Sequence, residues 1–223
     1  MKTEIKEKIM ATNQKYLKKF LTEEAPAKLE SQLEHMDWSY LDMIHNKEQQ
    51  RGAFSPLAAM ELLEIEANKD KYLATGLDAV KNGKVGAILL AGGQGTRLGF
   101  DKAKGMFNIG KTKELYIFEQ LIANLMKVTN QAGTWVPLYV MTSEINDGMT
   151  REFFEEHDYF GYNKDYVKFF VQEMVPAVDF DGNLLMKSED SLAMSPNGNG
   201  GWFKSLINAG LDKDLKDKGV EWL

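Results

Sequence analysis

The pattern of hydrophobic and polar positions divides the chain near residue 83. Before this point, apolar residues recur at roughly helical spacing, which predicts helices over most of residues 1–83. The residues that set this spacing near the start of the chain are Ile5, Ile9, Tyr16, Leu17 and Phe20. After this point, strand-like runs alternate with helix-like runs, which predicts βαβ units around a mainly parallel sheet.

Two local signals mark the ends of one early helix. Ser55-Pro56 is typical of a helix start, because serine caps free N–H groups and proline fits the first turn. Asn82-Gly83 favours a helix end, because both residues tolerate the left-handed conformation. The residues that a helix starting at Ser55 would turn inward are Leu57, Met60, Leu62 and Leu63.

The second part of the chain predicts an α/β domain. Its strand-like runs are 84–90, 136–142 and 166–171, and its helix-like runs are 114–128, 147–157 and 201–210. We therefore expect a helical region at 1–80, packed on an α/β domain at 81–223. Gly219–Leu223 has the character of another strand opening, so we expect the chain to be a fragment or a truncated product.

Composition narrows the class of protein. With 43% hydrophobic and 27% charged residues, the chain of 223 residues resembles an ordinary globular protein. A net charge of −6 argues against a nucleic-acid partner, which would favour a basic patch. The absence of cysteine excludes disulfides and thiolate metal sites, and we expect a cytoplasmic protein. The charged start and the lack of long apolar runs predict neither a signal peptide nor a membrane span.

The most informative stretch joins an apolar run to a glycine-rich segment. Val85–Leu90 predicts a buried strand, and Ala91–Gly99 follows it with four glycines. A glycine-rich loop after a strand can turn its backbone N–H groups toward one phosphate. Arg97 adds a forked cation and Lys104 a mobile one, so the stretch predicts a nucleotide site. The alternative is that the glycines only form turns and both cations lie in solvent.

Two other phosphate motifs compete with this interpretation. The dinucleotide fingerprint G-x-G-x-x-G fails because Leu98 occupies its sixth position. Gly105–Thr112 satisfies the P-loop pattern G-x-x-x-x-G-K-[ST], but Phe100–Lys104 before it does not resemble a buried strand. A P-loop nucleoside triphosphatase therefore remains a distant alternative to a nucleotidyltransferase.

Four motifs in the same order along the chain resemble the UDP-sugar pyrophosphorylases, which are UTP-dependent sugar-1-phosphate uridylyltransferases. Within that family the resemblance is greatest to the UDP-N-acetylhexosamine pyrophosphorylases, and it runs from about residue 84 to residue 210. The motifs are Leu90–Gly99 with Lys104-Gly105-Met106, Tyr139–Ser143, Phe153–Gly161, and Phe169–Gln172 through Val175–Ala177 to Pro196–Gly201.

The resemblance implies a fold, a reaction and a set of binding residues. The fold is a three-layer α/β domain of the nucleotide-diphospho-sugar transferase type, with an N-terminal helical region. The reaction is uridylyl transfer from UTP to a hexose 1-phosphate, with N-acetylglucosamine 1-phosphate favoured and glucose 1-phosphate accepted. Lys104 and Arg97 would be the catalytic cations. The residues that the resemblance assigns to substrate are Leu90, Ala91, Gly92, Gly93, Gly95, Thr96, Gln172, Gly198 and Asn199.

Each assigned residue has a chemical reason for its role. Gly92 and Gly93 would contact the nucleobase and ribose, and Gly95, Thr96 and Arg97 the triphosphate. The Gln172 amide both donates and accepts, which suits the edge of uracil. Gly198 would let the backbone approach the base, and Asn199 would lie on the sugar side, in an Asn-Gly-Gly run typical of the N-acetylhexosamine branch.

Departures from the family pattern limit these expectations. Ala103 stands where the family has proline, so we expect a looser approach to Lys104. Asn197 stands where an acidic residue is usual, and the metal-binding V-D-N motif has no counterpart before Leu223. Mg²⁺ is expected as cofactor, but no ligand can be named. The alternative function is a non-catalytic nucleotide-binding fragment, and we expect little turnover from residues 1–223 alone.

The three histidines form no ligand cluster in the sequence. They lie at positions 35, 45 and 157. We expect His157 to pack among Phe153, Phe154 and Tyr159 rather than to bind a metal. The sequence leaves the oligomeric state open.

Overall fold

The computed structural model describes residues 1–45, 53 and 55–223, with only the backbone for 43–45. The chain forms two compact units, each built from two separate segments. The first combines Met1–Leu57 with Met174–Asn197, and the second combines Ala58–Glu173 with Gly198–Leu223. These units differ from the expected division at residue 80, because 58–80 belongs to the second unit and 174–197 to the first.

The first unit joins N-terminal helices to short antiparallel strands. Its helices are α1 (Thr3–Ala11), the 3-10 helix η1 (Lys15–Leu21), α2 (Ala27–His35) and α3 (Ser39–His45). Its strands are β4 (Met174–Pro176), β5 (Met186–Ser188), β6 (Ser191–Leu192) and β7 (Met194–Pro196). β4 pairs with β7 and β5 pairs with β6, both antiparallel.

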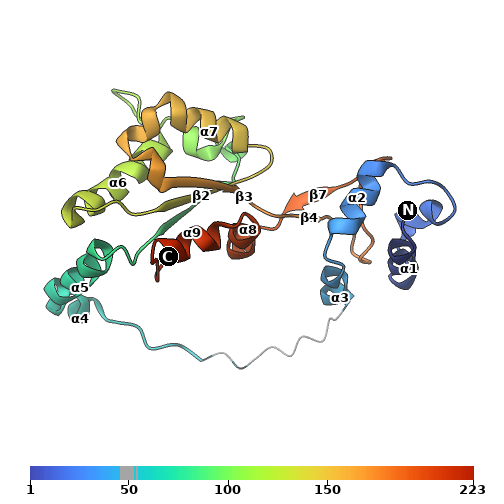
Figure 1. Cartoon of the computed structure of the whole chain (residues 1–223), viewed down its shortest axis with the longest axis horizontal. Helices are drawn as coiled ribbons and strands as arrows, with labels where there is room; N and C mark the ends of the chain where they lie inside the picture. The colour runs from blue at the N-terminus through green and yellow to red at the C-terminus, as the bar shows by residue number, and fades with distance from the viewer. Residues whose placement is uncertain (46–52, 54) are drawn as a thin grey trace. The chain divides into compact units, whose positions relative to one another are not determined.

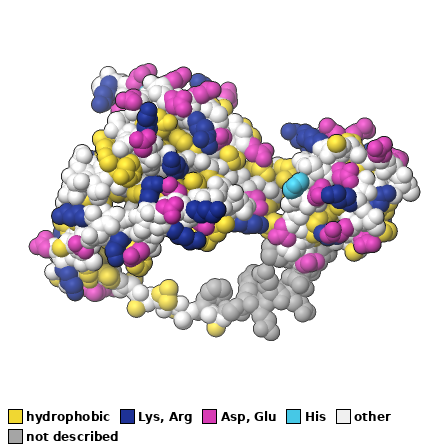
Figure 2. Space-filling model, viewed as in Figure 1, with side chains coloured by type: hydrophobic (Ala, Val, Ile, Leu, Met, Phe, Trp, Pro, Cys, Tyr) yellow, Lys and Arg dark blue, Asp and Glu magenta, His cyan; other side chains and the backbone are white. Residues whose placement is uncertain are grey.

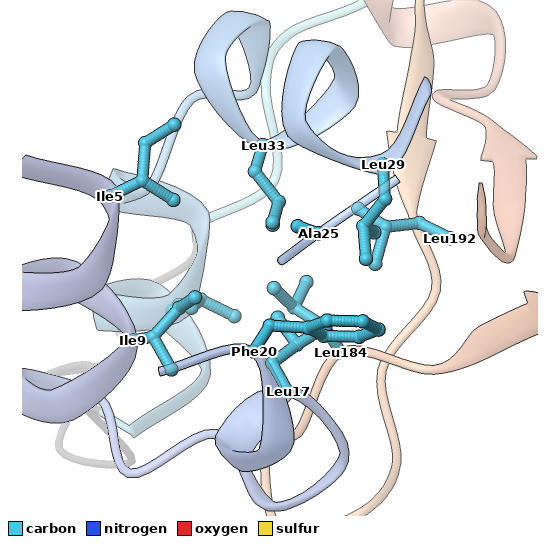
Figure 3. Packing of buried hydrophobic residues seen from close by; sticks show 10 residues of the cluster. Ile5, Ile9, Leu17, Phe20, Ala25, Leu29, Leu33, Leu184 and Leu192 are labelled. Atoms are coloured by element: carbon cyan, nitrogen blue, oxygen red, sulfur yellow. The ribbon is translucent and has the colours of Figure 1, made fainter. Parts of the chain in front are cut away.

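One apolar cluster holds the first unit together (Figure 3). Leu29 and Leu33 of α2 are fully buried together with Leu184 and Leu192 from the strand segment. The predicted inward positions Ile5, Ile9, Leu17 and Phe20 are buried in the same cluster. Tyr16 is 40% exposed, so its predicted inward position is wrong. It directly precedes the buried Leu17 on η1, and adjacent positions of a helix do not face the same side.

Buried amide side chains tie the two segments of the first unit. Gln14 donates from Nε2 to the Gly182 carbonyl at 3.1 Å and accepts the Leu184 N–H at Oε1 at 2.6 Å. The Leu192 N–H donates to Gln32 Oε1 at 2.8 Å. These bonds satisfy polar groups that would otherwise be buried without partners.

The second unit is an α/β domain. Its helices and strands are α4 (Leu62–Ala67), α5 (Lys69–Lys81), β1 (Ala87–Leu90), η2 (Thr96–Leu98), η3 (Lys104–Met106), α6 (Ile117–Ala132), β2 (Leu138–Thr142), α7 (Asp147–Glu156), η4 (Asp158–Gly161), η5 (Lys164–Tyr166), β3 (Val167–Val171), η6 (Asn199–Gly201), α8 (Trp202–Asn208) and α9 (Leu211–Asp217). The three strands form one parallel sheet in the order β1-β2-β3. All three predicted strands and all three helices predicted after residue 83 are confirmed, with shifted ends.

Helices cover both faces of the parallel sheet (Figure 1). Leu138 and Val140 of β2 pack with residues of α6 and α7. Tyr139 and Met141, which alternate with them, pack with Leu206 of α8 and with α9. Because successive side chains of a strand point to opposite faces, β2 is buried throughout. The predicted three-layer α/β architecture is confirmed.

The edges of the sheet are less covered than its centre. β1 is half-buried, and Leu90 at its end is 39% exposed, so the expected full burial of Val85–Leu90 is wrong. β1 has β2 on one side, whereas on its other side the described residues add only one parallel bridge, between Val85 and Trp222. Gly219–Leu223 therefore does approach the sheet as a strand opening, through the Gly86 N–H that donates to the Trp222 carbonyl at 2.8 Å.

The helix predicted to start at Ser55 is wrong. Residues 55–61 are not helical, α4 begins at Leu62, and Leu57 and Leu63 are 92% and 79% exposed. A short amphipathic segment needs tertiary packing on its apolar face to stay helical, and the described residues provide none here. The helix end at Asn82-Gly83 is confirmed, because α5 ends at Lys81 and Gly83 adopts φ +70°.

The surface carries mixed charge. Basic and acidic side chains are interspersed over the face shown in Figure 2. Within the described ranges, no helix is both long and apolar enough to cross a membrane.

Candidate functional site

The site lies at the carboxyl edge of the parallel sheet in the second unit. The glycine-rich loop follows β1, Ser143 follows β2 and Gln172 follows β3. Parallel strands end on the same side of a sheet, and open α/β sheets bind ligands at that edge. The Ala91 N–H donates to the Met141 carbonyl at 2.7 Å, and the Gln172 N–H to the Thr142 carbonyl at 2.8 Å. The loops that follow β1 and β3 are therefore both anchored by hydrogen bonds to the end of β2.

The glycine-rich loop folds back on itself and brings Lys104 to Gly93. The Gly95 N–H donates to the Lys102 carbonyl at 2.9 Å, and the Lys104 N–H to the Gly93 carbonyl at 3.1 Å. Ala103 lies between these two bonds and is fully buried. Gly99 turns the chain with φ +65°, a conformation that favours glycine. The two ends of the loop are thus held side by side, as an anion site formed by both would require.

Several backbone N–H groups at the start of this loop are available to a ligand. Those of Gly92, Gly93 and Gln94 donate no hydrogen bond to another residue in the part of the chain that the structure describes. The Gly95 N–H is occupied, and Gly95 is buried against Phe100, where a Cβ would lie 2.8 Å from the ring. Gly95 therefore shapes the loop, whereas Gly92 and Gly93 leave donors free.

Gly92 and Gln172 lie in direct contact. A Cβ on Gly92 would lie 2.7 Å from Gln172 Nε2, so the amide occupies the space of the missing side chain. Gln172 is only 6% exposed, and its backbone is fixed on β2. The structure thus brings together the two positions assigned to the nucleobase, although they are 80 residues apart in the sequence.

The two predicted catalytic cations are exposed on the same loop. Arg97 and Lys104, like Thr96, lie on the surface. Neither cation forms a salt bridge with any residue that the structure describes. A cation without an ion pair remains available to an anionic ligand, because no carboxylate competes for it.

The loop that carries Gly198 and Asn199 is fixed by a residue that no motif selects. Gly198 adopts φ +74° and ψ −179°, which only glycine adopts readily, and Asn199 after it is exposed. The Ser205 hydroxyl accepts the Glu173 N–H at 2.9 Å and donates to the Gly201 carbonyl at 3.0 Å. Ser205 thereby links this loop to the residue that follows Gln172.

The P-loop pattern at Gly105–Thr112 does not form a phosphate loop. Asn108 pairs with Tyr116 in an antiparallel bridge, and α6 begins only at Ile117. The Asn108 side chain accepts the Gly110 N–H at 2.9 Å, so that donor is not available to a phosphate. Gly105 lies against the Phe118 ring instead of facing a ligand.

The described histidines and acidic residues form no group that could hold a metal ion. Among the described residues, no three His, Cys, Asp or Glu side chains gather into a group that could hold a metal ion. The side chain of His45 lies outside the described part. His157 packs against Phe153 as predicted, with a centroid distance of 4.1 Å, but its other ring contacts are Tyr116 and Phe160.

The chain matches a known protein family along most of its length. The sequence model of the family described as UTP--glucose-1-phosphate uridylyltransferase matches residues 17–223. The UDP-N-acetylglucosamine pyrophosphorylase of Saccharomyces cerevisiae is 35% identical over 170 residues, which cover 74% of this chain and 36% of that protein. UDP-N-acetylhexosamine pyrophosphorylase-like protein 1 of Xenopus tropicalis is 39% identical over 160 residues, covering 69% of this chain and 31% of that protein.

A solved structure extends the match over the whole fold. The crystal structure of the uridine diphosphate N-acetylglucosamine pyrophosphorylase from Trypanosoma brucei, in complex with an inhibitor, aligns with 97% of this chain and 49% of its own. The TM-score is 0.71 and the sequence identity 27%. The chain spans about 30% to 43% of the length of the curated relatives that it matches.

Proposed function

Because the chain belongs to the UTP--glucose-1-phosphate uridylyltransferase family, we propose that it takes part in uridylyl transfer from UTP to a hexose 1-phosphate. The products are a UDP-sugar and pyrophosphate. The observation that carries the proposal is the contact between Gly92 and the Gln172 amide beside the free N–H groups of the glycine-rich loop. That arrangement offers a donor and an acceptor to a nucleobase next to donors for its phosphates.

The reaction needs positioning and charge neutralisation more than covalent catalysis. An oxygen of the sugar phosphate attacks the α-phosphorus of UTP and forms a new P–O bond. The bond from the α-phosphorus to its bridging oxygen breaks, and pyrophosphate leaves with that electron pair. Lys104 would stabilise the charge that builds on the α-phosphate, and Arg97 would bind the triphosphate. Their exposure without ion pairs among the described residues supports both roles.

We propose Mg²⁺ as the counter-ion of the triphosphate, bound mainly through phosphate oxygens. The side chains that the structure describes do not fit a protein-held ion, since none of them group into a metal site. Asp147, at the start of α7, already accepts the Thr142 hydroxyl at 2.5 Å and pairs with Arg151 at 2.8 Å. No step of the mechanism is therefore assigned to the metal. The cytoplasmic location also stays a prediction.

We propose N-acetylglucosamine 1-phosphate as the preferred sugar, with glucose 1-phosphate also accepted. Relatives named as UDP-N-acetylglucosamine pyrophosphorylases support this preference. In the loop after Gly198, Asn199 offers an amide, and the following glycines leave room for a bulky 2-substituent. Rejection by shape alone is modest, roughly 10–200-fold, so the glucose substrate should still react.

Calorimetric titration with UTP and with ATP tests the nucleotide assignment. We expect tighter binding of UTP, because Gln172 is placed to recognise uracil. Tighter binding of ATP would reject the proposal. In a second measurement, made on a version extended to the length of the curated relatives, pyrophosphate release that requires the sugar phosphate would support transfer. UTP binding without such release would support the second candidate, a nucleotide-binding protein without turnover.

Two lysines of one surface segment give a matched pair of variants. Made in the same extended version, Lys104→Ala should lower pyrophosphate release by on the order of 10²-fold, as for loss of a transition-state donor. Lys111→Ala should leave it unchanged, because the P-loop pattern around Lys111 does not form a phosphate loop. Equal turnover of Lys104→Ala and the parent would remove Lys104 from the mechanism.

A further inference from the structure

Asn146 is a completely buried polar side chain at the carboxyl edge of the sheet, and no motif selects it. It has no exposed surface and follows β2 by four residues, at the first turn of α7. Its Oδ1 accepts the Ser143 N–H at 2.8 Å, and its Nδ2 donates to the Ala91 carbonyl at 3.0 Å. Asn146 thus joins the end of β2 to the root of the glycine-rich loop.

The position of Asn146 makes this use of its side chain informative. Asn146 is the N-cap residue of α7, where asparagine commonly bonds to the free N–H groups of the first turn. Here its side chain makes no cap hydrogen bond and reaches across to Ala91 instead. Asn146 therefore serves the loop rather than its own helix.

The hydrogen bond from Asn146 to Ala91 lies directly before Gly92, one of the two positions assigned to the nucleobase. Ala91 is held by its N–H on Met141 and by its carbonyl on Asn146, so each of the two peptide groups that flank Ala91 has one fixed hydrogen bond. Gly92 then packs against the Gln172 amide. We propose that Asn146 is a positioning residue for uracil recognition, acting through Ala91 and Gly92 on Gln172. This inference rests on the proposed function.

Asn146→Asp is the sharpest test, because it keeps the shape and the acceptor for Ser143 but replaces the donor with a second acceptor. It places a carboxylate oxygen against the Ala91 carbonyl, which would push the loop root away. Asn163→Asp is the matched control for the same chemical change. The Asn163 side chain accepts the Asp165 N–H at 3.0 Å and caps a helix of the same unit. Asn146→Ser is the second variant, because serine can cap α7 but is too short to reach Ala91.

The readouts are calorimetric affinity for UTP and CTP, and amide hydrogen exchange of residues 91–95, where the hydrogen-bonded N–H groups of Ala91 and Gly95 carry the signal. We expect Asn146→Asp to weaken UTP binding roughly tenfold or more, as for loss of a buried hydrogen bond. The preference for UTP over CTP should narrow, and exchange should quicken in residues 91–95 more than in β2. Asn163→Asp should match the parent in all three measurements, and Asn146→Ser should follow Asn146→Asp in weaker form.

Two outcomes would overturn the inference. One is an unchanged UTP-to-CTP preference with unchanged exchange at residues 91–95. The other is faster exchange spread evenly over the unit, which is the sign of a purely structural residue. A parent chain that binds no UTP would reject the proposed function, whereas the exchange comparison would still decide whether Asn146 fixes the loop.

Discussion

Gly92→Ala tests directly whether the absence of a side chain at this position allows Gln172 to read a base. The new Cβ would lie 2.7 Å from Nε2, 2.9 Å from Cδ and 3.1 Å from Oε1 of Gln172, where ordinary contact begins at 3.4 Å. The glutamine backbone cannot move easily, because its N–H is bonded to Thr142. The amide itself must therefore leave its place.

The expected loss follows from the hydrogen bonds that this amide would make to uracil. Displacing a polar partner from a buried hydrogen bond costs about 1–3 kcal/mol. Since 1.4 kcal/mol is tenfold in affinity, UTP binding should weaken roughly 5- to 140-fold. The assay is calorimetric titration with UTP and CTP. The CTP affinity should fall less, because the lost contact is specific for the uracil edge.

Gly148→Ala is the control for the same chemical change. Gly148 is exposed in α7 with no atom within 4 Å of the added Cβ. Its UTP affinity should equal that of the parent, and its stability should rise by up to about 1 kcal/mol, because alanine favours a helix. Parent-like UTP affinity in Gly92→Ala would refute the idea that the Gly92 contact sets the position of Gln172.

Three further changes have expected outcomes that urea unfolding can measure. Gly105→Ala would place a Cβ 2.1 Å from the Phe118 ring, so it should destabilise by about 1–3 kcal/mol or more, and a parent-like midpoint would contradict the close packing. Ser205→Ala removes both hydrogen bonds of a buried hydroxyl and should lower the free energy of unfolding by about 1–3 kcal/mol. A decrease smaller than experimental error would contradict this expectation. Burial raises the pKa of Tyr162 to about 12, so the unfolded chain loses its phenol proton first and stability should fall as pH rises from about 10 to 12. Tyr162→Phe should reduce that fall, and an unchanged pH profile would exclude Tyr162 as its source.

The sequence was sufficient to predict the central strand of the α/β unit. β2 reads as a continuous apolar run because both of its faces are covered, and local composition records that directly. The turn at Gly83 was equally predictable, because its left-handed conformation favours one residue type. Features of this kind depend on residues that are neighbours in the chain.

Features that depend on distant partners were not predictable from pattern. The contact between Gly92 and Gln172 joins loops after two different strands, and only the family resemblance selected both positions. Asn146 carries no signal beyond being a polar residue after a strand, and its bond to Ala91 depends on the packing of β1 beside β2. Leu57 failed as a core residue for the same reason, since its pattern is apolar but no described neighbour covers it.

The first unit is formed by two segments that are distant in the sequence, and this has a consequence for synthesis on the ribosome. The apolar faces of α1, η1 and α2 emerge early, yet Leu184 and Leu192, which complete their core, are made only after residues 58–173. At roughly 5–20 residues per second, this interval lasts on the order of ten seconds. The three strands of the second unit are synthesised within that interval, but α8 and α9, which cover one face of β2, come only after it. We therefore expect nascent chains arrested before residue 174 to carry an N-terminal segment that proteases and chaperones still recognise.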